Sequence, residues 1–206
     1  PESQPWDSSG FSPDGSLKIE YTHRLNRILE KTNQLSMVVI LGLFYFGQDE
    51  RLQDEKAIKS AVRNACEWVL SNGYENVVIE INNECSVPKY EHEILQPHRV
   101  HELIKLAKSV SINSRSLLAG TSYGGNTIPG NDVTKSSDFI LMHGNGVTEP
   151  SRISEMIKET RELSDWVDMP ILFNEDDHFE FDKEKNNFNC AINSYAGWGY
   201  FDPGAG

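Results

Sequence analysis

Apolar runs that suit strands alternate with amphipathic segments that suit helices along most of this chain, and this alternation constrains its fold more than any other feature. The run at 37–46 is nearly continuous, which is typical of a strand buried on both faces of a parallel sheet. In 54–71, Ile58, Val62 and Ala65 recur at helical spacing. Strict alternation of this kind predicts a parallel sheet with crossover helices.

The segment 1–16 is rich in turn residues and is expected to be a loop. The predicted strands are 37–46, 77–82, 116–121, 139–143, 170–174 and a short run at 199–201, and the predicted helices are 16–35, 54–71, 98–110, 150–163 and 185–197. A (β/α)8 TIM barrel needs eight strands and typically about 250 residues. The chain has 206 residues and its first regular element is a helix. It is therefore expected to be an α/β protein with a single domain over 1–206, a fragment of a TIM barrel that lacks the first two strands and runs from about strand three to strand eight.

The charge balance narrows the class of partner. The chain has 19 basic and 31 acidic residues, a formal net charge of −12. Nucleic acids and anionic membranes select basic surfaces, so neither is expected as a partner, whereas a neutral sugar is compatible. No apolar run approaches the roughly 20 residues of a transmembrane helix. Three cysteines without CxxC spacing indicate neither a zinc site nor a disulfide framework.

In parallel α/β folds, functional residues gather beyond the carboxyl ends of the strands. In this chain those positions hold carboxylate, amide and aromatic groups, while Ser and Lys are nearly absent. A serine nucleophile or a Schiff-base lysine therefore has little support. The candidates at the strand ends are Tyr45, Asn83, Glu84, Tyr123, His143, Asn145, Glu175, His178 and Trp198.

Two Asn-Glu pairs each close an apolar strand, at Asn83-Glu84 and at Asn174-Glu175. Cleavage of a glycosidic bond requires two opposed carboxyl groups. One protonates the leaving oxygen and later activates water, and the other attacks the sugar carbon or holds the opposing charge. Amides beside them can bind sugar hydroxyls, and aromatic side chains at the same rim suit the faces of sugar rings.

The segment 76–84, NVVIEINNE, resembles strand four of the retaining glycoside hydrolases of clan A, close to the cellulase-like family 5, and 171–175, ILFNE, resembles strand seven. The two glutamates are 91 residues apart, which fits three βα units. The resemblance implies Asn83 as a substrate-binding residue, Glu84 as acid/base and Glu175 as nucleophile. It also implies an oligo- or polysaccharide substrate with β linkages and a secreted or periplasmic location. For this reaction we expect no cofactor and no metal.

The chain departs from the family pattern at several places. Tyr45 and Phe46 stand where the family usually has a strand-three His, and the strand-six His-x-Tyr appears as His143-Gly144-Asn145. Trp198 matches the strand-eight Trp only loosely. The substrate-binding residues expected around the carboxyl pair are Asn83, His143, Tyr45, Asn145, Tyr123, His178 and Trp198.

Two other functions remain open from the sequence. The first is a metal-dependent hydrolase on the same scaffold, with Glu175, Asp177, His178 and His143 as ligands. The second is a barrel that binds glycans without cleaving them. The distance between the two carboxyl groups discriminates further, since about 5–5.5 Å is expected for a retaining glycosidase and about 6.5–9.5 Å for an inverting one. The oligomeric state is left undetermined.

Overall fold

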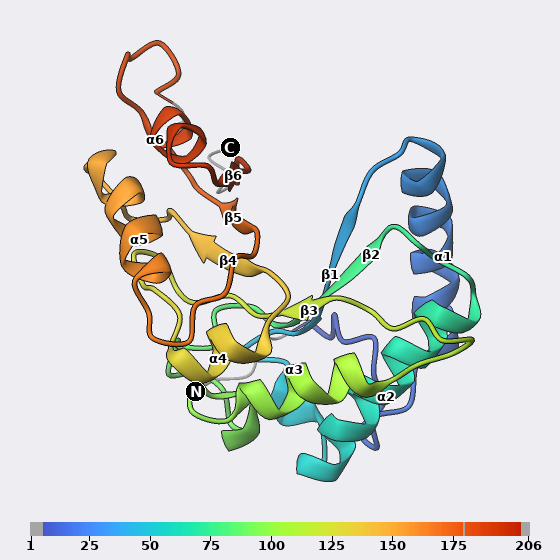
Figure 1. Ribbon diagram of the computed structural model, residues 1–206. Coiled ribbons are helices and arrows are strands. Elements are labelled where there is room, and N and C mark those ends of the chain that lie inside the picture. Colours follow the sequence, from blue (N-terminus) through green and yellow to red (C-terminus); the bar gives the residue numbers. More distant parts are fainter. Residues whose placement is uncertain (1–5, 179, 203–206) are drawn as a thin grey trace.

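The computed structural model describes residues 6–178 and 180–202, which form a twisted array of parallel strands with helices on its outer side (Figure 1). The strands are β1 (Val39–Phe44), β2 (Val77–Asn82), β3 (Ala119–Gly120), β4 (Ile140–His143), β5 (Ile171–Glu175) and β6 (Gly197–Trp198). They pair in parallel in the orders β1-β2-β3 and β4-β5-β6. A parallel bridge between Ser122 and Leu141 joins the two groups. Strands of consecutive βα units thus lie side by side, as in a partial (β/α)8 barrel.

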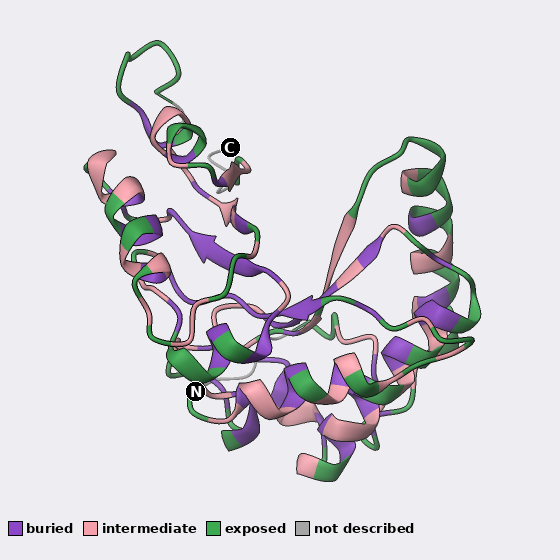
Figure 2. Cartoon of the chain, viewed as in Figure 1, coloured by how far each residue is buried: buried purple, intermediate pink, exposed green. Residues whose placement is uncertain are grey.

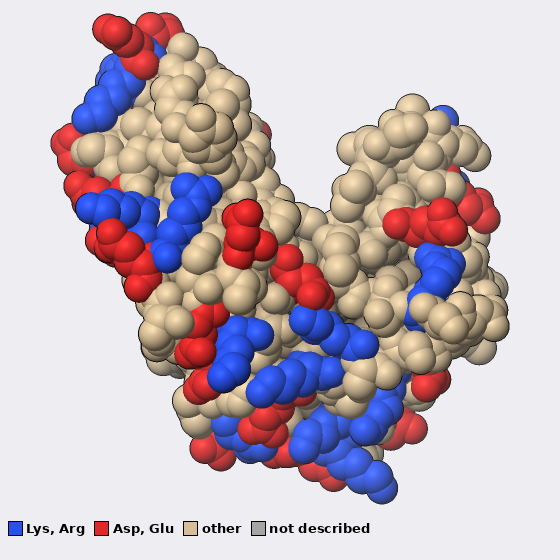
Figure 3. Space-filling view, in the orientation of Figure 1, with Lys and Arg blue, Asp and Glu red and all other residues tan. Residues whose placement is uncertain are grey.

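The helices cover one side of this array. They are α1 (Ile19–Gln34), α2 (Glu55–Ser71), α3 (Val100–Ser109), α4 (Asn131–Ser136), α5 (Ser151–Arg161) and α6 (Asn187–Asn193), with 3-10 turns η1 (Asp49–Arg51) and η2 (Glu93–Leu95). Figure 3 shows a hollow between the arm that carries α1 and the arm that carries β5 and α6. Within the described ranges, no helix is both long and apolar enough to cross a bilayer.

The core consists of two clusters, and β4 is buried along its whole length (Figure 2). The first cluster packs β1–β3 against α2 and α3, with Ile58 and Ile79 fully buried. The second packs β4–β6 against α5 and α6, with Phe173 at its centre. Apolar residues at helical spacing on α2 account for its place in the core, and Asp54 caps its first turn by accepting the Ala57 N–H at 2.7 Å.

The expected elements are present, with shifted boundaries. The strand predicted at 116–121 shortens to Ala119–Gly120, and α4 was missed because its six residues carry little apolar periodicity. The prediction at the C-terminal end was wrong in register: α6 ends at Asn193, and the last strand is Gly197–Trp198 rather than 199–201. The cause is a turn after α6, in which Tyr195 adopts a left-handed φ of 56°.

Candidate active site

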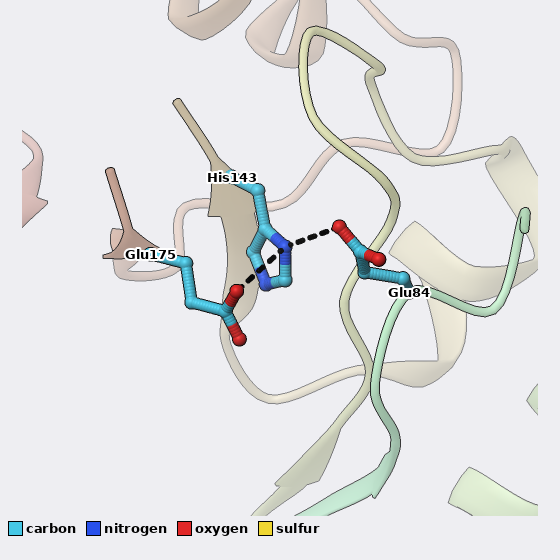
Figure 4. Close-up of side chains that lie close together, drawn as sticks. All are labelled: Glu84, His143 and Glu175. Atoms are coloured by element: carbon cyan, nitrogen blue, oxygen red, sulfur yellow. Dashed lines mark hydrogen bonds and ion pairs between the residues drawn. The ribbon is translucent and has the colours of Figure 1, made fainter. Parts of the chain in front are cut away.

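The carboxyl ends of β2, β4 and β5 bring Glu84, His143 and Glu175 together (Figure 4). His143 closes β4 and Glu175 closes β5, and a register shift after Met142 sets these two residues opposite each other. Glu84 follows β2 in a left-handed conformation, with φ of 50°. Such a backbone is unfavourable for a residue other than glycine. It is held by the Ser122 hydroxyl, whose oxygen accepts the Glu84 N–H at 2.9 Å.

One ring nitrogen of His143 faces both carboxylates. Its Nδ1 lies 3.0 Å from Oε1 of Glu84 and 3.6 Å from Oε2 of Glu175. Taken as one atom from each residue, the three groups lie within 4.8 Å of one another. The His143 side chain is fully buried, whereas those of Glu84 and Glu175 are 18% and 23% exposed. The two carboxylates therefore remain accessible from the hollow, and the imidazole lies behind them.

The loop after β4 holds Glu175 by both its main chain and its side chain. The Gly144 N–H donates to the Glu175 carbonyl at 2.7 Å, and Asn145 Nδ2 donates to Glu175 Oε2 at 3.3 Å. Asn145 stands where the resembled motif has a tyrosine. Its Oδ1 is buried and has no hydrogen-bond partner among the described residues.

Tyr45 and Asn83 line a cavity of about 360 Å³ that reaches Glu175. The Tyr45 ring packs on Phe46, with centroids 4.2 Å apart. Partial burial, and then the negative charges of Glu84 and Glu175, raise the pKa of Tyr45 above its ordinary value. Its hydroxyl therefore stays protonated and can donate a hydrogen bond to a bound molecule.

Two buried carboxyl groups on the same cavity were missed by the sequence analysis. Glu80 of β2 is 7% exposed, and burial is the main cause that raises its pKa. Asp49 of η1 is 1% exposed, and burial raises its pKa to about 6. A charged residue inside the apolar run of β2 was the available signal for Glu80. Nothing local distinguishes Asp49 from a solvated loop residue.

Three predicted substrate contacts lie elsewhere. Tyr123 is only 5% exposed within the first core cluster, and its hydroxyl accepts the Gly130 N–H at 3.1 Å, so the structure corrects its assignment to that of a packing residue. His178 Nδ1 lies 3.1 Å from Asp176 Oδ1, and Trp198 Nε1 donates to Asp176 Oδ2 at 2.8 Å. In the described contacts, neither His178 nor Trp198 is joined to the carboxylate pair.

The ligand set of the alternative metal site is not assembled in one place. His143 and Glu175 belong to the group with Glu84, whereas Asp177 and His178 belong to a second group with Asp176. In the second group the Asp176 oxygens already accept N–H donors from His178, Asn187 and Trp198. A cation there would have to displace these donors, so the structure favours a hydrogen-bonded carboxylate over a metal ligand.

Known structures share this arrangement of strands and helices. A glycoside hydrolase family 17 beta-1,3-glucanosyltransferase from Rhizomucor miehei has a TM-score of 0.62 and 13% identity, over 90% of this chain and 73% of its own. A chitinase from Bacteroides thetaiotaomicron has a TM-score of 0.61 and 12% identity, over 94% and 78%. A GH5-4 broad specificity endoglucanase from an uncultured bacterium has a TM-score of 0.54 and 10% identity, over 93% and 70%.

The chain has the fold of a partial (β/α)8 barrel, which it shares with these glycoside hydrolase structures. Neither a protein-family model nor a curated protein matches the sequence. At sequence identities of 10–13%, the similarity shows the fold alone, and the similar structures come from several families. Membership of family 5 therefore stays a prediction.

Proposed function

We propose that this protein is a glycoside hydrolase that cleaves a β-linked glycan with retention of configuration. The observation that carries the proposal is the approach of Glu84 and Glu175, which have carboxylate oxygens within 4.8 Å of each other. Retaining glycosidases hold their two carboxyl groups about 5–5.5 Å apart, whereas inverting enzymes leave about 6.5–9.5 Å for a water molecule. An approach of one oxygen from each carboxylate to within 4.8 Å is compatible with the retaining separation, and we take retention as the proposed outcome.

The first half of the reaction forms a covalent intermediate. A carboxylate oxygen of Glu175 attacks the anomeric carbon and forms an ester bond to it, while the bond from that carbon to the glycosidic oxygen breaks. A protonated Glu84 gives its proton to the departing oxygen, which leaves as an alcohol. Glu84 is then a carboxylate and Glu175 carries the sugar.

The second half returns both glutamates to their starting states. Glu84 removes a proton from a water molecule, and the hydroxide oxygen attacks the anomeric carbon on the face that the leaving group vacated. The ester bond breaks, and the electron pair returns to Glu175. Two displacements at one carbon give overall retention.

Neighbouring side chains support these roles. The Asn145 amide and the main-chain N–H of Gly144 fix Glu175 in place. His143, with Nδ1 protonated, donates to Glu84 and lies near enough to Glu175 to couple the charges of the pair. Donors fixed in advance stabilise developing charge without reorganising during the reaction.

The substrate class follows from the walls of the site. The cavity beside Glu175 offers carboxyl groups, the Asn83 amide and the Tyr45 ring. Sugars present hydroxyl groups and apolar ring faces that match such walls. One of the similar proteins, an active-site mutant of the Rhizomucor miehei beta-1,3-glucanosyltransferase, was solved in complex with laminaritriose. That precedent supports an oligosaccharide ligand for this chain.

Substrates with different leaving groups distinguish the role of Glu84 from that of Glu175. Glu175→Gln should lower the rate of hydrolysis of every substrate by at least about three orders of magnitude, because no nucleophile remains. Glu84→Gln should abolish hydrolysis of natural oligosaccharides, whose leaving groups need a proton from the acid. It should still form the intermediate from aryl glycosides whose leaving groups are acidic phenols, because such a phenol departs without being protonated. The exposed Glu149→Gln is the matched control.

A panel of β-linked gluco-, xylo- and chito-oligosaccharides and aryl glycosides provides the assay. Activity of Glu175→Gln equal to that of the wild type would overturn the proposal. Binding of an oligosaccharide by the wild type, without any cleavage across the panel, would favour a glycan-binding barrel instead.

A further inference from the structure

Asp176, which directly follows Glu175, is a fully buried carboxylate at the centre of a hydrogen-bond network. Its Oδ1 accepts the His178 main-chain N–H at 3.0 Å and faces His178 Nδ1 at 3.1 Å. Its Oδ2 accepts Trp198 Nε1–H at 2.8 Å, and Asn187 Nδ2 lies 3.0 and 3.2 Å from the two oxygens. A buried carboxylate is costly unless it is well hydrogen-bonded, so a carboxyl group in this position needs a reason.

The donors come from every element around the end of β5. His178 lies on the loop that follows β5, Asn187 begins α6, and Trp198 ends β6. The carboxylate also packs closely against the loop after β4, since a Cβ on Gly144 would lie 2.2 Å from Asp176 Oδ2. Asp176 therefore contacts the same loop that holds Glu175.

The network also fixes the ring of Trp198. Its strand pairs Trp198 with Phe173, so both side chains lie on the face of the sheet that packs against α5 and α6. The rings of Phe181, Phe188 and Tyr200 surround the indole at centroid distances of 5.6–6.4 Å. The indole ring thus packs among aromatic side chains, and its N–H is bonded to Asp176. These contacts fix its position beside β5, the strand that carries Glu175.

We propose that Asp176 is a positioning residue for Glu175. Its carboxylate ties β6, α6 and the β5–α6 loop to the end of β5, and so it holds the nucleophile at its distance from His143 and Asn145. This inference rests on the proposed function, because it assigns a role relative to the reaction of Glu175. Asp176 does not touch the cavity beside the pair and acts through its neighbours.

A loosened nucleophile affects the chemical step more than binding, because a displacement of about 1 Å in a reacting group costs roughly a hundredfold in rate. In Asp176→Asn the amide nitrogen replaces one oxygen and faces either the His178 main-chain N–H or the Trp198 indole N–H. Two donors cannot bond each other, so one contact is lost. We expect kcat to fall at least about tenfold, with KM within about twofold of the wild type.

A compensating variant separates positioning from simple loss of charge. In D176N/N187D, the new amide at 176 accepts from Trp198 Nε1 and donates to the new carboxylate at 187, so two contacts of the network are restored, while the His178 main-chain N–H still loses its acceptor. We therefore expect a partial recovery, with kcat at least about threefold above that of D176N. Asp182→Asn removes the same charge at an exposed site of the same loop and should leave kcat and KM unchanged.

The measurements are kcat and KM on the best glycoside of the panel, together with the indole ¹H–¹⁵N resonance of Trp198. A kcat of D176N within twofold of the wild type, or no recovery in a folded D176N/N187D, would overturn the proposal. Should D176N fail to fold, Trp198→Phe keeps the carboxylate and removes one donor, and an unchanged kcat there would overturn it equally. Failure of the proposed function is distinct, since Glu175→Gln would then be as active as the wild type, or the wild type would cleave no glycoside of the panel.

Discussion

Asp49 should make the stability of this protein depend on pH in a direction opposite to that of most acidic residues. Its Oδ2 accepts main-chain N–H groups of Glu91 and His92 at 2.9 and 3.2 Å, while Oδ1 is buried without a partner among the described residues. Burial outweighs these two bonds and raises the pKa of Asp49 from 3.8 to about 6. The folded protein thus keeps this proton at pH values where the unfolded chain has lost it.

The size of the effect follows from the two pKa values. Between about pH 4 and 6 the folded state holds the Asp49 proton more tightly than the unfolded state, so stability falls as pH rises. A difference of about two pKa units corresponds to roughly 3 kcal/mol in full, of which about 2.5 kcal/mol is lost between pH 4 and 7.5. Asp49→Asn has no group that titrates here. The free energy of unfolding of Asp49→Asn minus that of the wild type should therefore rise by about 2.5 kcal/mol from pH 4 to pH 7.5.

Urea unfolding of both proteins at these two pH values, followed by circular dichroism, measures the change. Asp182→Asn is the matched control, because it makes the same change of side chain at an exposed position. A difference between wild type and Asp49→Asn that stays constant to within about 0.5 kcal/mol would refute the reasoning, as would a change of the opposite sign.

Other substitutions test single contacts of the site. Asn145→Ala removes the amide that donates to the nucleophile, so kcat/KM should fall roughly tenfold, and a loss below twofold would contradict its role. Gly144→Ala places a methyl group 2.2 Å from the Asp176 carboxylate and should lower the urea-derived stability by about 1–3 kcal/mol, whereas Gly199→Ala, with contacts no closer than 3.5 Å, should cost less. Tyr45→Phe should weaken activity by a factor that is constant from about pH 6 to about pH 9, because the raised pKa of Tyr45 keeps its hydroxyl protonated; a factor that varies in this range would count against that role.

The architecture was largely readable from local patterns. Apolar runs alternating with amphipathic helices suffice to predict parallel βα units, because each pattern reports which face of an element is covered. The same logic located Glu84 and Glu175, since each closes such a run. The structure brings these two residues together with His143, as their positions at the carboxyl ends of parallel strands suggested.

Other features depend on register and distant contacts, which local patterns do not encode. A shift of the last strand from 199–201 to Gly197–Trp198 sets Trp198 on the helix-covered face, because side chains alternate along a strand. Asp176 reads as one residue of an acidic run. Its partners Asn187 and Trp198 lie 11 and 22 positions farther along the chain, so only the fold reveals a buried network.

The stereochemistry of cleavage tests the central claim most directly. Proton NMR during the first minutes of hydrolysis distinguishes the anomer released by the enzyme from the one formed by later mutarotation. The approach of Glu84 and Glu175 predicts that a β-glycoside releases the β-anomer first. Initial release of the α-anomer would indicate a single displacement by water, and it would contradict the assignment of Glu175 as the nucleophile.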